Sequence, residues 1–128
     1  MGNVHAEASI AKPVEEVWKV AGDFGGLERY FPGIEACRVD GKSRFLKMGQ
    51  MEIQEDMESR DDATHTLIYG IAGGPVPVTK HRCTVTVTPD GDGSKVSFDC
   101  EYEPDDMAAI FEPTYQGAVT SLKAYLEG

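Results

Sequence analysis

A carboxylate and an imidazole, Glu55 and His81, stand in two segments that alternate between apolar and polar residues. Alternate residues of a strand point to the same face, so each of the two shares its face with apolar neighbours. Burying an unpaired polar group is costly, and a buried acid near an imidazole can work as a general acid/base pair. The pair therefore predicts proton transfer in an apolar cavity, or two groups that only satisfy each other's hydrogen bonds. A third ligand at metal-binding spacing is missing, so we expect no metal.

Two tyrosines extend this predicted polar row. If the hairpins fold symmetrically about their turns, Glu55 lies opposite Tyr69, and Tyr69 lies opposite His81. The same folding places His81 opposite Tyr102. A slip by two residues would change these pairings but would leave all four side chains on the inner face. We therefore expect at least one of the two tyrosines to lie within hydrogen-bond reach of Glu55 or His81.

Further side chains are candidates for contact with a ligand. On the inner faces of the strands and in the flanking segments these are Tyr30, Phe31, Met57, Cys83, Phe98, Cys100, Phe111 and Tyr115. The turn near Gly91 places Cys83 opposite Cys100, and we expect both thiols to be reduced. Arg44, directly before Phe45, could enter the cavity or lie on its rim, and the sequence leaves this open.

The element that must organise these residues is the last segment, Asp105 to Gly128. Its apolar residues recur at helical spacing of three and four: Met107, Ile110, Phe111, Thr114, Tyr115, Ala118, Val119, Leu122, Tyr125 and Leu126. Upstream, the segment from Val4 to Ile10 alternates as a strand, and the segment from Pro13 to Phe31 predicts two short helices. Six further strands are expected at Ile34–Val39, Arg44–Met48, Met51–Glu58, Thr64–Ile71, Val78–Thr88 and Lys95–Glu103. Short turns between strands force antiparallel neighbours, so we predict an α+β fold with a curved sheet around the long helix.

Composition limits the class of partner. The 128 residues predict one domain, residues 1–128, and the net charge of −10 argues against binding to nucleic acid or to an anionic membrane. No apolar run approaches the roughly 20 residues of a membrane span, and we see no secretory signal. Three cysteines without a CxxC spacing indicate a reducing compartment, so we expect a cytoplasmic protein.

The order of elements, together with several local motifs, resembles the START-like (SRPBCC) superfamily, and within it the bacterial polyketide cyclase/dehydrase-type proteins. The matching motifs are Ala11-Lys12-Pro13-Val14-Glu15-Glu16-Val17-Trp18, Phe24-Gly25-Gly26-Leu27, Ile53-Gln54-Glu55, Leu67-Ile68-Tyr69-Gly70-Ile71, Pro75-Val76-Pro77-Val78 and Tyr102-Glu103-Pro104. The resemblance implies the helix-grip fold, in which a seven-stranded antiparallel sheet grips a C-terminal helix over a hydrophobic cavity. The chain departs from the pattern at Phe98, where Trp is often found, and at His81, where Tyr is common.

The resemblance implies two classes of function. The first is an enzyme that abstracts a proton α to a carbonyl and assists cyclisation or dehydration, with Glu55 or His81 as base. Tyr69 and Tyr102 would hold the substrate oxygens. The second is a non-catalytic carrier or sensor of a hydrophobic ligand, and an accessory role beside a larger enzyme is a third alternative. In each case we expect a hydrophobic small molecule as the partner, no cofactor, and a monomer or homodimer.

Overall fold

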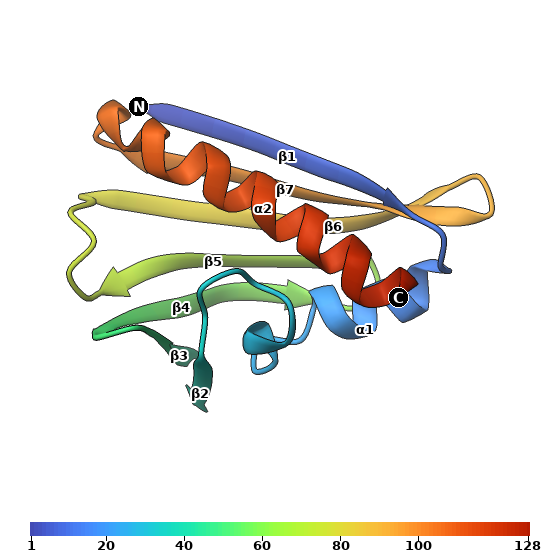
Figure 1. Ribbon diagram of the computed structural model, residues 1–128, viewed down its shortest axis with the longest axis horizontal. Helices are drawn as coiled ribbons and strands as arrows, with labels where there is room; N and C mark the ends of the chain where they lie inside the picture. The colour runs from blue at the N-terminus through green and yellow to red at the C-terminus, as the bar shows by residue number, and fades with distance from the viewer.

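In the computed structural model, which describes residues 1–128, seven strands form one antiparallel sheet in the order β1-β7-β6-β5-β4-β3-β2 (Figure 1). The strands are β1 (Gly2–Ile10), β2 (Ala36–Asp40), β3 (Ser43–Met48), β4 (Met51–Asp61), β5 (Thr66–Gly73), β6 (Lys80–Asp90) and β7 (Gly93–Glu103). The crossover from β1 to β2 places these two strands at opposite edges of the sheet. The predicted α+β helix-grip architecture is confirmed.

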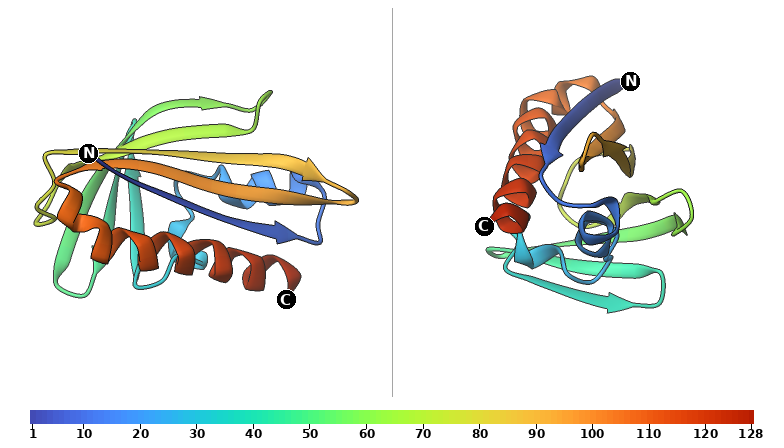
Figure 2. Two further views of the ribbon diagram at one scale, coloured as in Figure 1. Left: turned by 90° about the horizontal axis from the view of Figure 1, so that it is seen from above. Right: turned by 90° about the vertical axis from the view of Figure 1, so that its right-hand side faces the viewer.

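Two helices lie against the concave side of this sheet. The long helix α2 (Ala108–Glu127) follows a single 3-10 turn, η2 (Asp105–Met107), and it runs along one side of the bent sheet (Figure 2). The helix α1 (Val14–Ala21) packs against β6 and β7. The second short helix predicted before β2 is only a 3-10 turn, η1 (Leu27–Arg29), because the glycine pair before it and the Pro32-Gly33 break after it leave no room for more. Neither helix is long and apolar enough to cross a membrane.

The β4–β5 hairpin turns later than predicted. We expected the turn at residues 60–62, whereas β4 continues to Asp61 and the chain reverses between Asp62 and His65. The carboxylate of Asp61 accepts hydrogen bonds from the N–H groups of Ala63 and Thr64, at 2.8 and 3.4 Å, and His65 has a φ of 52°. Such side-chain capping by Asp favours a turn directly after it.

The register across the sheet differs from the symmetric hairpins that we predicted. The later turn and one irregularity between Met57 and Ser59 place Glu55 opposite Ile71 and Met57 opposite Tyr69, so the predicted pairing of Glu55 with Tyr69 is wrong. The predicted pairing of Tyr69 with His81 is also wrong, because Tyr69 lies opposite Cys83. The β6–β7 ladder has the predicted register, with His81 opposite Tyr102.

Strands β5 and β6 separate after a short ladder. They pair only over residues 66–69 of β5, and Figure 1 shows them diverging beyond that point. At the start of the split, a Cβ on Gly70 would lie 2.3 Å from the carbonyl oxygen of His81. A glycine is therefore needed for the two backbones to approach this closely. Beyond the split, the backbone N–H of Ile71 has no partner on β6. It donates a hydrogen bond to the side chain of His81 instead.

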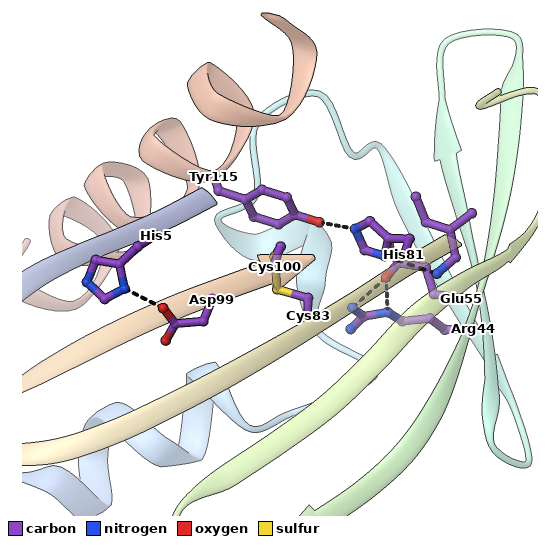
Figure 3. The surroundings of a disulfide bond; sticks show 9 residues. His5, Arg44, Glu55, His81, Cys83, Asp99, Cys100 and Tyr115 are labelled. Atoms are coloured by element: carbon purple, nitrogen blue, oxygen red, sulfur yellow. Dashed lines mark hydrogen bonds and ion pairs between the residues drawn. A yellow bond between two sulfur atoms is a disulfide. The ribbon is translucent and has the colours of Figure 1, made fainter. Parts of the chain in front are cut away.

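Cys83 and Cys100 are cross-strand neighbours, as predicted, but they are joined as a disulfide (Figure 3). The expectation that both thiols are reduced is therefore wrong for this structure. The pairing follows from register, since the two residues face each other across the β6–β7 ladder and are both buried. Cys37 is the one free cysteine, and its thiol donates to the carbonyl oxygen of Phe24 at 3.6 Å.

Candidate functional site

A cavity of about 130 Å³ lies between the first half of α2, the inner faces of β3, β4 and β5, and the segment around η1. Twelve of its 14 lining residues are hydrophobic, so it favours apolar ligands. The lining comprises Leu27, Phe31, Ile34, Leu46, Met48, Met51, Ile53, Glu55, Ile71, Val76, Ile110, Phe111, Thr114 and Tyr115. Met51 and Ile110 are 43% and 55% exposed, which places the mouth of the cavity between the β3–β4 turn and the start of α2.

One wall of the cavity holds a buried ion pair. Arg44 and Glu55 lie opposite each other on β3 and β4, and the Nε and Nη2 groups of Arg44 both donate to Oε1 of Glu55, at 2.9 and 2.6 Å. Only 1% of the Arg44 side chain and 8% of the Glu55 side chain are exposed. The remaining nitrogen, Nη1, donates to the carbonyl oxygen of Phe24 at 3.1 Å. The sequence left the position of Arg44 open, and the structure places it inside.

Aromatic rings complete the surroundings of Arg44. The carbon at the centre of its guanidinium lies 4.3 Å from the ring centroid of Phe24 and 4.5 Å from that of Tyr69. Such contacts stabilise a cation that has lost its water. Burial is the largest single influence and lowers the pKa of the guanidinium, but the charge and hydrogen bonds of Glu55, together with Tyr69 and Tyr30, outweigh it, and the pKa is raised. Arg44 therefore remains charged and holds Glu55 as its counter-ion.

The second carboxylate oxygen of Glu55 is free to meet a ligand. Both hydrogen bonds from Arg44 go to Oε1, and no protein group donates to Oε2. Every fully buried side-chain nitrogen or oxygen in the protein has a hydrogen-bond partner. Because Oε2 has none, it must have accessible surface, and Glu55 lines the cavity. A charged acceptor is thus presented to an apolar space.

His81 is fully engaged by hydrogen bonds (Figure 3). The backbone N–H of Ile71, at the split between β5 and β6, donates to Nδ1 at 3.2 Å. Nδ1 therefore carries no proton, so the single proton of the neutral ring is on Nε2, which donates to the Tyr115 hydroxyl oxygen at 2.8 Å. Burial lowers the pKa of His81 to about 4, which keeps the ring neutral near pH 7. Neither nitrogen is available to a ligand.

Tyr115 brings a hydrogen-bond donor to the cavity. Its oxygen accepts from His81, so its own hydroxyl hydrogen remains to be donated. Burial raises the pKa of Tyr115, and the negative charge of Glu55 raises it further, so the hydroxyl stays protonated. Tyr115 and Glu55 both line the cavity, and together they form its polar end, with one donor and one acceptor.

With this geometry established, comparison with known proteins defines the family. The model of the family described as polyketide cyclase / dehydrase and lipid transport matches residues 1–127. The chain belongs to this family. No protein among those with curated functions matches it.

Solved structures share the fold of this polyketide cyclase/dehydrase and lipid transport family member. XoxI from Bacillus cereus is 24% identical, with a TM-score of 0.93 over 99% of this chain and 96% of its own. A START superfamily protein from Mycobacterium smegmatis is 16% identical, with a TM-score of 0.85 over 99% and 98%. DynU16, a protein of the dynemicin biosynthetic locus, is 20% identical, with a TM-score of 0.77 over 99% of this chain and 48% of its own.

The predicted site residues of this family member fall into two groups. Four of them line the cavity: Phe31, Glu55, Phe111 and Tyr115. The others do not line it. Met57, Tyr69 and His81 line a separate, more open hollow between β4, β5 and the start of β6, and the core contains Tyr30, Cys83, Phe98, Cys100 and Tyr102. Tyr102, for example, packs its ring 4.9 Å from that of Phe111, and Phe98 lies 5.9 Å from Tyr115. These rings support the aromatic wall from behind.

The tyrosine that forms a hydrogen bond with His81 is not one of the two that we expected. We expected at least one of Tyr69 and Tyr102 to lie within hydrogen-bond reach of Glu55 or His81. Neither hydroxyl bonds to them, and Tyr115 of α2 bonds to His81 instead. Several lining residues were also missed: Leu27, Ile34, Leu46, Met48, Met51, Ile53, Ile71, Val76, Ile110 and Thr114. Strand alternation could have found some of them, since Leu46 and Met48 share a face with Arg44.

Proposed function

We propose that this chain binds a small hydrophobic molecule in the cavity beneath α2 and holds it without transforming it. The observation that carries the proposal is the complete engagement of His81, whose two nitrogens serve Ile71 and Tyr115. An acid/base pair needs a second group that can exchange a proton with the ligand, and His81 lacks a free site for it. The family description names both catalysis and lipid transport, so it fits a carrier as well as an enzyme.

The ion pair also opposes proton shuttling by Glu55. If its carboxylate took up a proton from a substrate, Arg44 would remain as a charge with 1% of its side chain exposed and no counter-ion. Breaking a buried pair by neutralising one partner costs about 3–5 kcal/mol. That cost would be added to the barrier of each turnover, whereas a carrier with the same cavity would never incur it.

One observation favours the second candidate, an acid/base enzyme of the cyclase or dehydratase type. Oε2 of Glu55 is free of protein partners, and the Tyr115 hydroxyl has a hydrogen to donate at the same end of the cavity. Glu55 would then remove a proton α to a carbonyl while Tyr115 donates to the carbonyl oxygen. Tyr69 and Tyr102 have no part in this version.

Binding is tested first with toluene as an apolar probe. Titration followed by two-dimensional amide NMR should shift signals of the cavity lining. Ile110→Trp should block the mouth and weaken binding at least tenfold, because Ile110 lines the cavity and is already exposed. The matched control, Gln116→Trp, places the same ring on an exposed position of α2 outside the cavity and should bind as the wild type does. Shifts that are absent, or equal in both variants, would contradict the proposal.

Turnover is tested with 4-hydroxy-4-methyl-2-pentanone, a small hydroxyketone that loses water after removal of its α proton. We expect the compound to be recovered unchanged after incubation with the protein. Formation of the unsaturated ketone and water by the wild type, and its loss in Glu55→Gln, would favour the enzyme over the carrier.

A further inference from the structure

The polar end of the cavity suggests which ligands it accepts. We propose that the cavity selects small neutral molecules bearing one hydroxyl group, such as a single-ring phenol or a short alcohol, and rejects carboxylates. The inference rests on the proposed ligand-binding function and adds the chemical class of the ligand.

Glu55 provides the hydrogen-bond acceptor at the polar end of the cavity. Both hydrogen bonds from Arg44 go to Oε1, while Oε2 shares the carboxylate charge and has no protein donor. The ion pair fixes the carboxylate on β4, so Oε2 is held in place before a ligand arrives. A ligand that donates a hydrogen bond satisfies this charged acceptor, and a ligand carboxylate would be repelled by it.

Tyr115 provides the hydrogen-bond donor at the same end of the cavity. The N–H of Ile71 fixes the tautomer of His81, and the Nε2–H of His81 then occupies the Tyr115 oxygen. The hydrogen of the Tyr115 hydroxyl is consequently the one left to donate. This chain of three groups turns a residue that could accept or donate into a donor.

A ligand hydroxyl group can bond to both residues at once, because it accepts one hydrogen bond, from Tyr115, and donates another, to Glu55. An aldehyde or ketone accepts from Tyr115 but leaves Oε2 unsatisfied. An apolar molecule satisfies neither group and would leave both polar atoms without a partner, which is costly. Selectivity therefore comes from the hydrogen bonds of the ligand with Tyr115 and Glu55, because the rest of the cavity contributes only apolar contacts.

Volume sets the size of the ligand. Apolar cavities of about 150 Å³ hold one benzene molecule, and this one measures about 130 Å³ with an open mouth. One aromatic ring, or a chain of similar bulk, fills it, and a substituent opposite the hydroxyl would point to Met51 and Ile110 at the mouth.

The test compares four probes of nearly equal size at pH 7 by NMR titration: 4-methylphenol, toluene, 4-methylbenzaldehyde and 4-methylbenzoate. We expect 4-methylphenol, which stays neutral because phenols ionise near pH 10, to bind about tenfold to a hundredfold more tightly than toluene, the range for a hydrogen bond to a charged group. The aldehyde should fall between them, and 4-methylbenzoate should not bind. Equal binding of 4-methylphenol and toluene, or preference for the benzoate, would overturn the inference and leave the carrier proposal standing. Failure of all four probes to bind would overturn both.

A variant of Tyr115 tests whether its hydroxyl group causes the preference for 4-methylphenol over toluene. Tyr115→Phe should lower the affinity for 4-methylphenol at least fivefold and leave that for toluene unchanged, which also shows that the cavity is intact. The matched control is Tyr125→Phe, a change at a 47% exposed tyrosine of the same helix, and it should alter neither affinity. Equal losses for both probes in Tyr115→Phe would mean that the hydroxyl serves only the fold. If this variant does not fold, the wild-type ranking of the four probes still decides the inference.

Discussion

Replacing Arg44 with Met should be among the most destabilising single changes in this protein. The substitution keeps much of the side-chain bulk but removes the charge that neutralises Glu55, whose side chain is only 8% exposed. It also removes three hydrogen bonds, two to Glu55 and one to the carbonyl of Phe24. Leaving one member of a buried ion pair unpaired costs about 3–5 kcal/mol.

A surface pair provides the matched control. Arg82 also donates two hydrogen bonds to a glutamate, from Nε to Oε1 and from Nη2 to Oε2 of Glu58, at 3.0 and 2.6 Å, but the two side chains are 46% and 55% exposed. Solvent screens such a pair, so Arg82→Met should cost less than about 1 kcal/mol. The control thus removes an arginine that donates two bonds at similar distances to a glutamate, but from a pair that solvent screens.

Urea unfolding followed by the fluorescence of Trp18, the one tryptophan, measures both variants. With an m-value of roughly 1.5 kcal/mol per molar urea, Arg44→Met should lower the midpoint by about 2–3 M, and Arg82→Met by well under 1 M. The double variant Arg44→Met/Glu55→Leu should regain most of the loss, since no buried charge is left unpaired. Similar midpoints for the two single variants, or a double variant less stable than Arg44→Met, would refute this account.

Three further predictions test other parts of the structure. The pKa of His81 is lowered from 6.5 to about 4 in the folded protein, so its neutral form stabilises the fold fully above pH 6.5 and this contribution, about 3 kcal/mol, is lost as the pH falls toward 4. Between pH 7 and 4 the free energy of unfolding of the wild type should therefore fall by about that much more than that of His81→Gln, and parallel urea-derived profiles would contradict the burial of His81. Thiol labelling of the unfolded, unreduced protein should count one thiol, Cys37, and three after reduction, because Cys83 and Cys100 are bonded; three before reduction would show that the pair is not bonded. Gly70→Ala should cost about 1–3 kcal/mol in urea unfolding, because its Cβ would lie 2.3 Å from a backbone oxygen. Gly73→Ala, whose Cβ would be 3.4 Å from a side chain of β4, should be much milder, and equal losses would count against the close approach of β5 and β6.

The inner and outer faces of the sheet could be predicted from the sequence because alternation along a strand is a local property. Glu55, Tyr69, His81 and Tyr102 are all buried, as their apolar neighbours indicated. The long terminal helix followed from apolar spacing in the same way, and the order of elements led to the helix-grip fold. None of these inferences needs knowledge of which residues from different strands meet.

Register required the tertiary structure. The later β4–β5 turn and the irregularity between Met57 and Ser59 move the partner of Glu55 by two residues. The partner of Tyr69 on β6 also differs by two residues, and parity is preserved in both ladders. A bulge follows from how the whole sheet bends, and the flanking residues do not reveal it. The state of Cys83 and Cys100 likewise depends on their positions across the ladder, whereas the cysteine count had suggested free thiols.

The chemistry of the candidate site was decided by contacts between distant parts of the chain. Arg44 could have faced either way at the rim, and its burial depends on meeting Glu55, the Phe24 carbonyl and the ring of Tyr69. His81 has a free nitrogen in any isolated strand, and it loses that nitrogen only because β5 splits from β6 and α2 brings Tyr115 against it. Side-chain type thus predicted that polar groups lie inside, and packing determined which of them remain free to meet a ligand.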